Sequence, residues 1–249
     1  MTDFQVLIDL HKNNHRQGPG SDAVTEKALG LIPLSDTAKL KIADLGSGTG
    51  AQTLILAKLL KGDITAIDLF PDFLNILAEK AEKHGVSKSI KTVEASIDAL
   101  PFEPKSLDLI WSEGAIYNIG FEEGIRYWHS FLKPGGFIAV SEITWLTDSR
   151  PKEIEDYWQK AYPQIDTATN KIRQLKASGY HTIGHFMLPP DCWLEHYYKP
   201  LQDGFDAFLN RHHNSALARE IVAQEIAEIA LYSKYKTYYS YGFYVAQKI

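Results

Sequence analysis

Between residues 40 and 142, short apolar runs alternate with longer stretches whose apolar residues recur every three or four positions. The short runs have the length of buried strands, whereas the recurring pattern is typical of helices that cover a sheet. Strands that alternate with such helices form βαβ units, so the pattern predicts a parallel sheet with helices on both faces. The predicted strands are 41–44, 63–68, 90–94, 106–111 and 136–142, with helices at 51–60, 71–84 and 121–131 and a turn at 133–136.

The pattern changes on both sides of this region. In front of it, a helix is predicted over 3–12, and a polar loop at 13–20 leads to Ser21, which caps a helix running to about residue 31. The chain has no internal repeat, low-complexity tract or long linker, so we expect one domain over residues 1–249. Behind the central region, helices are predicted over 151–162, 166–178 and 191–235, and strands over 180–188 and 237–248. The expected additions to the core are an N-terminal lid at 1–30 and helical insertions at 146–178 and 189–235.

Composition narrows the class of protein. With 26 basic and 31 acidic residues, the net charge of −5 disfavours a broad basic surface for nucleic acid. Cys192 is the only cysteine, which excludes an internal disulfide and a cysteine-based metal cluster. The first ten residues carry Asp3 and Asp9 without a basic segment, and no apolar stretch approaches the roughly 18 residues that a membrane span needs. We therefore expect a soluble, cytoplasmic protein without a membrane partner.

A glycine-rich loop, Gly46-Ser47-Gly48-Thr49-Gly50, joins the first predicted strand to the next helix. In an open parallel sheet, ligands bind beyond the carboxyl ends of the strands, where the strand order reverses. Glycines let the backbone approach a ligand closely, and the helix start offers free N–H groups. Asp68 ends the second predicted strand, 18 residues after Gly50, where a carboxylate can accept hydrogen bonds from both ribose hydroxyls of an adenosine. The two features together predict a nucleotide-cofactor site.

The glycine spacing alone leaves the class of cofactor open. With Ala51, the loop also satisfies the dinucleotide pattern of nicotinamide and flavin enzymes. Asp44 stands two positions before the first glycine, where its charge would oppose a pyrophosphate but could accommodate an ammonium or a sulfonium group. Asp44 therefore favours S-adenosylmethionine.

Several separate motifs, in a fixed order, resemble those of the class I methyltransferases that use S-adenosylmethionine. They are the loop at 44–50, the acid Asp68, and the segments 95–102, 106–111 and 132–136. The similarity lies with the group that contains ubiquinone and menaquinone biosynthesis methyltransferases. It implies an α/β, Rossmann-like, doubly wound sheet of seven strands, mostly parallel with the last strand antiparallel, covered by helical cap elements. It also implies S-adenosylmethionine as cofactor and S-adenosylhomocysteine as product.

The resemblance further assigns roles to single residues. The glycine loop would pack against the methionine part of the cofactor, Asp68 would hold the ribose, and Leu69 and Phe70 would flank the adenine. Many relatives have an aspartate where Ser96 stands, so Ser96 or Asp98 would accept from the adenine amino group, beside Ile97. The expected cofactor-binding residues are Gln17, Gly18, Asp44, Gly46, Ser47, Gly48, Gly50, Asp68, Leu69, Phe70, Ser96, Ile97, Asp98, Glu113 and Gly114.

The methyl acceptor is expected to bind between the lid and the two insertions. Methyl transfer is an in-line displacement that depends mainly on positioning, and a general base helps only when the acceptor arrives protonated. Candidates for that base are Glu142, His185 and Tyr117. The spacings of His181, His185, Glu195 and His196 match no compact ligand motif, so no metal site is predicted.

These observations favour a methyltransferase that acts on an O, N or C nucleophile of a small molecule. An RNA or protein methyltransferase is the alternative, and a non-catalytic S-adenosylmethionine-binding protein is a weaker one. The segment Ser112-Glu113-Gly114-Ala115 stands where base-modifying enzymes carry an Asn-Pro-Pro-Tyr or Asn-Pro-Pro-Phe motif. A homodimer is compatible with the sequence, which does not define the acceptor.

Overall fold

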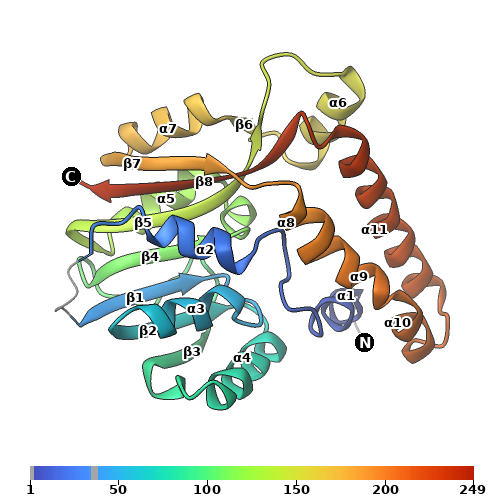
Figure 1. Ribbon diagram of the computed structural model, residues 1–249, viewed down its shortest axis with the longest axis horizontal. Helices are drawn as coiled ribbons and strands as arrows, with labels where there is room; N and C mark the ends of the chain where they lie inside the picture. The colour runs from blue at the N-terminus through green and yellow to red at the C-terminus, as the bar shows by residue number, and fades with distance from the viewer. Residues whose placement is uncertain (1–2, 35–38) are drawn as a thin grey trace.

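One mixed β-sheet organises the chain in the computed structural model, which describes residues 3–34 and 39–249 (Figure 1). The described residues form eight strands, of which seven follow the order β3-β2-β1-β4-β5-β8-β7. The first five strands run parallel, and β8 is antiparallel to both of its neighbours. The strands are β1 (Leu40–Leu45), β2 (Gly62–Asp68), β3 (Ile90–Glu94), β4 (Leu107–Glu113), β5 (Leu132–Trp145), β6 (Asp166–Thr167), β7 (Tyr180–Met187) and β8 (Tyr239–Lys248). The predicted architecture is confirmed, and the short β6, which pairs with the end of β5, is an addition to it.

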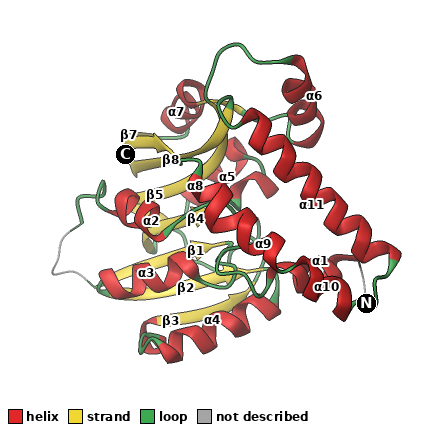
Figure 2. Ribbon diagram, turned by 45° about the vertical axis from the view of Figure 1, so that its right-hand side comes forward, coloured by secondary structure: helices red, strands yellow, loops and turns green. Residues whose placement is uncertain are grey.

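Helices cover both faces of the sheet (Figure 2). In the core, Ile110 and Trp111 are consecutive residues of β4 that pack into different buried clusters, one on each face. A strand whose neighbouring residues are both buried is apolar throughout, which explains the short continuous runs in the sequence. The helices are α1 (Asp3–His11), α2 (Asp22–Leu29), α3 (Ala51–Leu59), α4 (Pro71–Lys83), α5 (Phe121–His129), α6 (Lys152–Ala161), α7 (Ala168–Ala177), α8 (Asp191–Trp193), α9 (Lys199–Asp203), α10 (Phe205–Arg211) and α11 (Ala216–Tyr235), with short turns of helix η1 (Ser87–Ser89), η2 (Ile116–Asn118) and η3 (Leu194–Tyr198).

Two local predictions differ from the structure. The turn predicted at 133–136 lies within β5, because Leu107 pairs with Leu132 whereas Leu109 pairs with Phe137, so the residues between form an irregularity in a continuing strand. The predicted helical block at 191–235 is divided, and its second piece, η3, is a π-helical turn. A π turn shifts the side chains that follow it, and such turns are frequent at functional sites.

Helix α1 packs against the C-terminal helices, although it lies at the other end of the chain. Figures 1 and 2 show it beside α10 and α11, close to the carboxyl ends of β1 and β4. Asp9 of α1 binds Arg211 at the end of α10 and His212 immediately after it, at 2.9 and 3.0 Å. These contacts fix α1 over the edge of the sheet where the strand order reverses.

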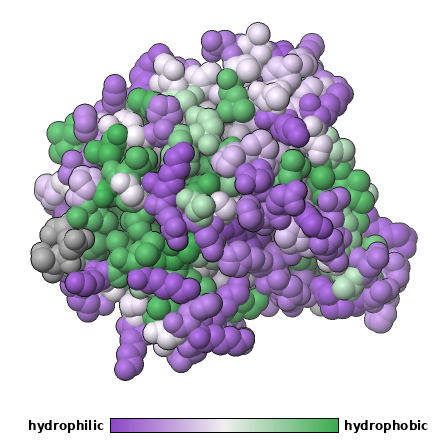
Figure 3. Space-filling view, viewed as in Figure 1, coloured by the Kyte–Doolittle hydropathy of each residue, from purple (hydrophilic) through white to green (hydrophobic). Residues whose placement is uncertain are grey.

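Apolar and hydrophilic residues are unevenly distributed over one face of the molecule. On the face shown in Figure 3, apolar residues gather on the left, over α2 and α3, whereas hydrophilic residues predominate on the right, over α9 and α10. No helix within residues 3–34 and 39–249 has both the length and the apolar character needed to cross a bilayer.

Candidate functional site

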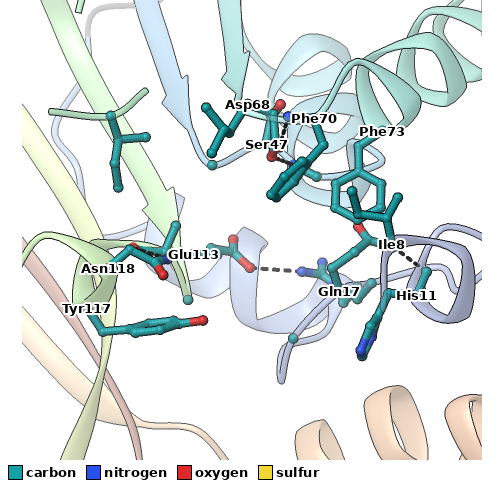
Figure 4. A pocket seen from close by; sticks show the side chains of 18 of the residues that line it. Ile8, His11, Gln17, Ser47, Asp68, Phe70, Phe73, Glu113, Tyr117 and Asn118 are labelled. Carbon is teal, nitrogen blue, oxygen red and sulfur yellow. Dashed lines mark hydrogen bonds and ion pairs between the residues drawn. The ribbon is translucent and has the colours of Figure 1, made fainter. Parts of the chain in front are cut away.

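A cavity of about 540 Å³ lies at the carboxyl ends of the strands, where the strand order reverses between β1 and β4 (Figure 4). This volume is typical of a site for a small molecule. The walls come from α1 and the loop after it, the glycine loop, the ends of β2, β3 and β4, the η2 turn and Tyr197 of η3. The position is the one that ligands take in open α/β sheets.

The glycine loop takes backbone conformations that favour glycine, and each glycine permits a different close approach. Gly46, Gly48 and Gly50 have φ values of 73°, 54° and 85°. A Cβ atom on Gly46 would lie 2.3 Å from Ala115 Cβ, and one on Gly48 would lie 2.5 Å from Gln17 Oε1. These two glycines line the cavity. Gly50 is not among the lining residues, and a Cβ atom added to it would collide with Leu77 Cδ1 of α4, so close packing against α4 requires this glycine.

Asp68 lies at the end of β2 and joins the two segments that flank it. Its Oδ2 accepts the N–H of Gly48 at 2.8 Å, and its Oδ1 accepts the N–H of Phe70 at 3.0 Å. Burial raises the pKa of Asp68, although the backbone donors lower it. Each carboxylate oxygen can accept a second hydrogen bond, so the side chain can still hold two ribose hydroxyls.

Asp44 lies beneath the loop and outside the cavity, so the structure does not place it against a cofactor. It accepts hydrogen bonds from the Thr53 hydroxyl and, at 3.3 Å, from the Gln52 amide, which also donates to Ser47 O. Burial raises the pKa of Asp44 to about 7, and the charges of Glu113 and Asp68 add to this effect. Its contacts show Asp44 fastening the loop to the start of α3.

The polar loop at 13–20 closes over the glycine loop, as a lid would. Gln17 Oε1 accepts the N–H of Thr49 at 2.8 Å. Arg16, 4% exposed, donates to Glu113 Oε2 at 2.8 Å. The other oxygen of Glu113 accepts from Thr25 Oγ1 at 2.7 Å and from Trp111 Nε1 at 2.9 Å. A buried ion pair therefore holds the lid against the end of β4.

One end of the cavity is aromatic. Phe70 lies between Phe4, with ring centroids 5.3 Å apart, and Phe73, whose ring meets it edge-on at 5.7 Å. The expected adenine neighbours all line the cavity, together with Ala95; they are Leu69, Phe70, Ser96, Ile97 and Asp98.

Helix α1, which belongs to the segment expected to form a lid, contributes a wall of the cavity through residues that were not named as candidates. Phe4, Leu7, Ile8 and His11 all line the cavity. Their spacing of three, one and three residues places them on one helical face. This spacing is visible in the sequence and could have indicated that α1 presents this face to a cavity. Figure 4 shows Ile8 and His11 on the opposite side of the cavity from Tyr117.

Of the three candidate bases, only Tyr117 lines the cavity. Glu142 is fully buried and forms an ion pair with Lys171 of α7 at 3.3 Å, outside the cavity. Burial raises the pKa of Glu142, against the opposing effect of Lys171. His185 lies on β7, separated from the cavity by other strands, and stacks on Tyr244 with ring centroids 6.1 Å apart. Glu142 and His185 therefore contact other side chains of the protein core and sheet, and neither faces the cavity.

The cavity contains buried polar atoms that lack a partner. Among the residues described, Ser47 Oγ and Arg16 Nε are enclosed and make no hydrogen bond, and both residues line the cavity. Buried polar atoms in native proteins are nearly always bonded, so these two fit a polar ligand such as the methionine end of the cofactor. Across residues 3–34 and 39–249, no group of three or more histidine, cysteine or acidic side chains is arranged to hold a metal.

Comparisons with known proteins agree with this geometry. Residues 42–136 match a family model described as a methyltransferase domain. Over 126 residues, the chain is 31% identical to the ubiquinone/menaquinone biosynthesis C-methyltransferase UbiE of Shewanella woodyi, and the alignment covers 49% of this chain and 47% of that relative. The chain spans about half the length of the curated relatives it matches.

Two solved structures share the fold over nearly the whole chain. An S-adenosylmethionine-dependent methyltransferase from Geobacter sulfurreducens, in complex with S-adenosyl-L-homocysteine, has a TM-score of 0.86 at 17% identity and covers 98% of both chains. The YjhP protein of E. coli has a TM-score of 0.86 at 18% identity and covers 98% of this chain and 100% of the other. These two likenesses show that the chain shares the fold of both structures, and the family match identifies residues 42–136 as similar to a methyltransferase domain.

Proposed function

We propose that the chain is an S-adenosylmethionine-dependent methyltransferase that acts on a small molecule. The observation that carries the proposal is the lid-covered cavity, in which Asp68 and the glycine loop face an apolar helix and Tyr117. The similar relatives are named as C-methyltransferases, but those alignments cover about half of each chain. The nucleophilic atom therefore depends on the residues that form this chain's own acceptor side.

The residues that would hold the cofactor form three groups. Asp68 would bind the ribose hydroxyls, and Ser96 or Asp98 would accept from the adenine amino group. At the methionine end, Arg16 and the glycine loop offer the unsatisfied Nε and the Ser47 hydroxyl. When bound, the cofactor supplies a methyl group on a positively charged sulfur and leaves as a neutral thioether.

The chain's own contribution is position and the exclusion of water. The lid is fixed by the Arg16–Glu113 pair and by Gln17, which closes the glycine loop from above. Holding two reactants in a reactive geometry can lower the barrier by about 7–11 kcal/mol. Because a cavity of about 540 Å³ beneath α1 suits a small acceptor, this feature supports a small molecule over RNA or protein. We propose that the lid at 1–30 and the insertions at 146–178 and 189–235 form its acceptor side within one domain.

Calorimetric titration with S-adenosylhomocysteine tests the proposal. Asp68→Ala should weaken binding by about 100-fold or more, because two hydrogen bonds to a carboxylate are lost. Asp63 at the start of the same strand is the matched control, since it is an exposed acid that pairs with Lys39 and Lys41. Asp63→Ala should bind as the parent does. The absence of binding by the parent protein, or equal affinity for the Asp68→Ala variant, would refute the assignment.

A further inference from the structure

A group of polar side chains gathers where α1, η3 and α11 meet, at the edge of the cavity. We name it the α11 cluster; its members are His11, Tyr197, Tyr198, Glu225 and Glu228. His11 and Tyr197 line the cavity, and the two acids stand behind them on α11. Figures 1 and 2 both show α1 beside α11. The family match covers residues 42–136, so every member of this cluster lies outside the matched domain.

The α11 cluster has more acidic than basic groups. Glu225 Oε1 pairs with His11 Nε2 at 3.4 Å, and Glu228 Oε1 accepts the Tyr198 hydroxyl at 2.9 Å. In the described part of the chain, neither acid forms an ion pair with lysine or arginine. The nearby cations Lys12 and Arg211 are bound to Asp9 instead, as is the imidazole of His212. The cluster therefore repels an anion and attracts a cation.

Three polar atoms of the cluster also lack a partner. Tyr197 is 8% exposed, and its hydroxyl makes no hydrogen bond to any residue in 3–34 or 39–249. His11 Nδ1 and Glu225 Oε2 are buried and equally unpartnered among those residues. Burial and the charges of Glu225 and Glu228 hold the pKa of Tyr197 well above its usual value. His11 Nδ1 and Glu225 Oε2 are hydrogen-bond acceptors, so they suit a ligand that carries N–H donors.

Aromatic rings border the same space. The imidazole of His11 stacks on Tyr197 with ring centroids 6.3 Å apart. Tyr117 enters the cavity from the opposite wall, and its side chain is 42% exposed (Figure 4). Ring faces bind ammonium groups through their quadrupole, and nearby carboxylates add to that attraction.

We propose that the α11 cluster is the acceptor subsite and that the acceptor is a cationic amine, an inference that rests on the proposed function. An amine arrives protonated, and its lone pair is free only after a proton has left. His11 Nδ1 accepts that proton, because Nε2 is held by Glu225. The nitrogen lone pair then forms the bond to the methyl carbon, the carbon–sulfur bond breaks with its electrons on sulfur, and the proton on His11 passes to water. The products are a methylated ammonium ion and a neutral thioether.

Calorimetry on the protein saturated with S-adenosylhomocysteine tests the class of acceptor. The probes are n-butylamine, n-hexylamine and 2-phenylethylamine, each with the alcohol and the carboxylate that keep its carbon skeleton. At least one amine should bind about tenfold more tightly than its alcohol and its carboxylate. Binding of S-adenosylhomocysteine without binding of any amine, or equal affinity for a carboxylate, overturns the subsite and leaves the proposed function standing. Failure to bind S-adenosylhomocysteine overturns the proposed function itself.

Two variants test the residues separately. Tyr197→Phe removes a hydroxyl without a partner, so the melting temperature should stay unchanged while amine affinity falls several-fold. Glu228→Gln removes the buried charge and should weaken amine binding about tenfold. Glu220 is an exposed acid on the same helix, so Glu220→Gln is the matched control and should change neither value. Unchanged amine affinity in both cluster variants contradicts the proposal.

The tautomer of His11 is an independent readout that needs no acceptor. Long-range ¹H–¹⁵N NMR should show the neutral ring protonated at Nε2, with Glu225 as its acceptor. Glu228, Tyr197 and Tyr198 are the other titratable groups near this ring. A neutral ring protonated at Nδ1 would exclude His11 as the proton acceptor.

Discussion

Arg16 of the lid and Glu113 at the end of β4 are 97 residues apart in sequence, and they form a buried ion pair at 2.8 Å. Both residues line the cavity. The pair thus joins the loop at 13–20 to the end of a central strand at the cavity. Any movement of this loop away from the cavity would break the ion pair.

Removing Arg16 should loosen the lid and leave a buried charge without its counterion. Arg16→Ala should lower the free energy of unfolding by about 3 kcal/mol and weaken S-adenosylhomocysteine binding at least tenfold. Urea unfolding and calorimetry measure the two effects. Adding Glu113→Gln should restore much of the stability but not the affinity. The exposed pair of Lys152 and Asp156 offers the control, because Lys152→Ala should change neither quantity.

The Lys171–Glu142 pair should matter for stability and not for cofactor binding. Lys171 also donates to Gln164 O at 2.9 Å and lies 4.6 Å from the centre of the Phe121 ring. Lys171→Met should destabilise the protein by about 3–5 kcal/mol, because Glu142 would remain buried without a counterion. The double variant with Glu142→Gln should recover most of that loss. A well-folded Lys171→Met protein that no longer bound S-adenosylhomocysteine would contradict this assignment.

Asp44 should make the protein less stable as the pH rises. Its pKa of about 7 in the folded state lies above its ordinary value, so the folded protein holds a proton that the unfolded chain has lost. The stability that this group contributes is therefore present at low pH and declines as the pH rises through 7. Between pH 5 and pH 8, the free energy of unfolding should fall more for the parent than for Asp44→Asn, by a few kcal/mol. Parallel pH profiles in urea would show that Asp44 is not protonated in the folded state.

Gly50 should be intolerant of a side chain for a reason unrelated to the cofactor. Gly50→Ala places a Cβ 2.1 Å from Leu77 Cδ1 at a φ of 85°. Gly85 is the control, with a φ of 69° and nothing within 4 Å of the added Cβ. Gly85→Ala should cost about 1–2 kcal/mol from backbone strain alone, and Gly50→Ala should cost about 1–3 kcal/mol more. Equal losses of stability in urea unfolding would argue against the contact with α4.

The sheet could be predicted from the sequence because its strands are local apolar runs. β3, at 90–94, matches the prediction at both ends, and the other core strands differ by a few residues. The departures depend on distant partners. Lys133–Gly136 has turn chemistry, but its pairing beside β4 keeps it within a strand. The preference of these four residues for a turn does not indicate the register in which β5 pairs with β4.

The residues expected at the site line the cavity where their chemistry and position are both local in the sequence. The glycine loop, Asp68 and the segment 95–98 stand at strand ends, and strand ends meet at one edge. Glu142 and His185 were chosen for their chemistry and their place after or on a strand. Glu142 instead pairs with Lys171, and His185 lies on β7 at the outer edge of the sheet. Neither the ion pair nor the position of β7 can be read from the spacing of residues in the sequence. In the same way, Asp44 accepts hydrogen bonds from Gln52 and Thr53 of the next helix, and the sequence did not indicate these partners.

The strand that completes the sheet is the last one to be made. β8 pairs with β5 over nine residues and separates it from β7, although it follows β5 by more than ninety residues in the chain. During synthesis, β5 therefore presents a long row of unpaired N–H and C=O groups until residues 239–248 have left the ribosome. An exposed strand edge of that kind invites pairing with other chains. The nascent protein should thus be most prone to aggregation, and most dependent on chaperones, in the interval between these two strands.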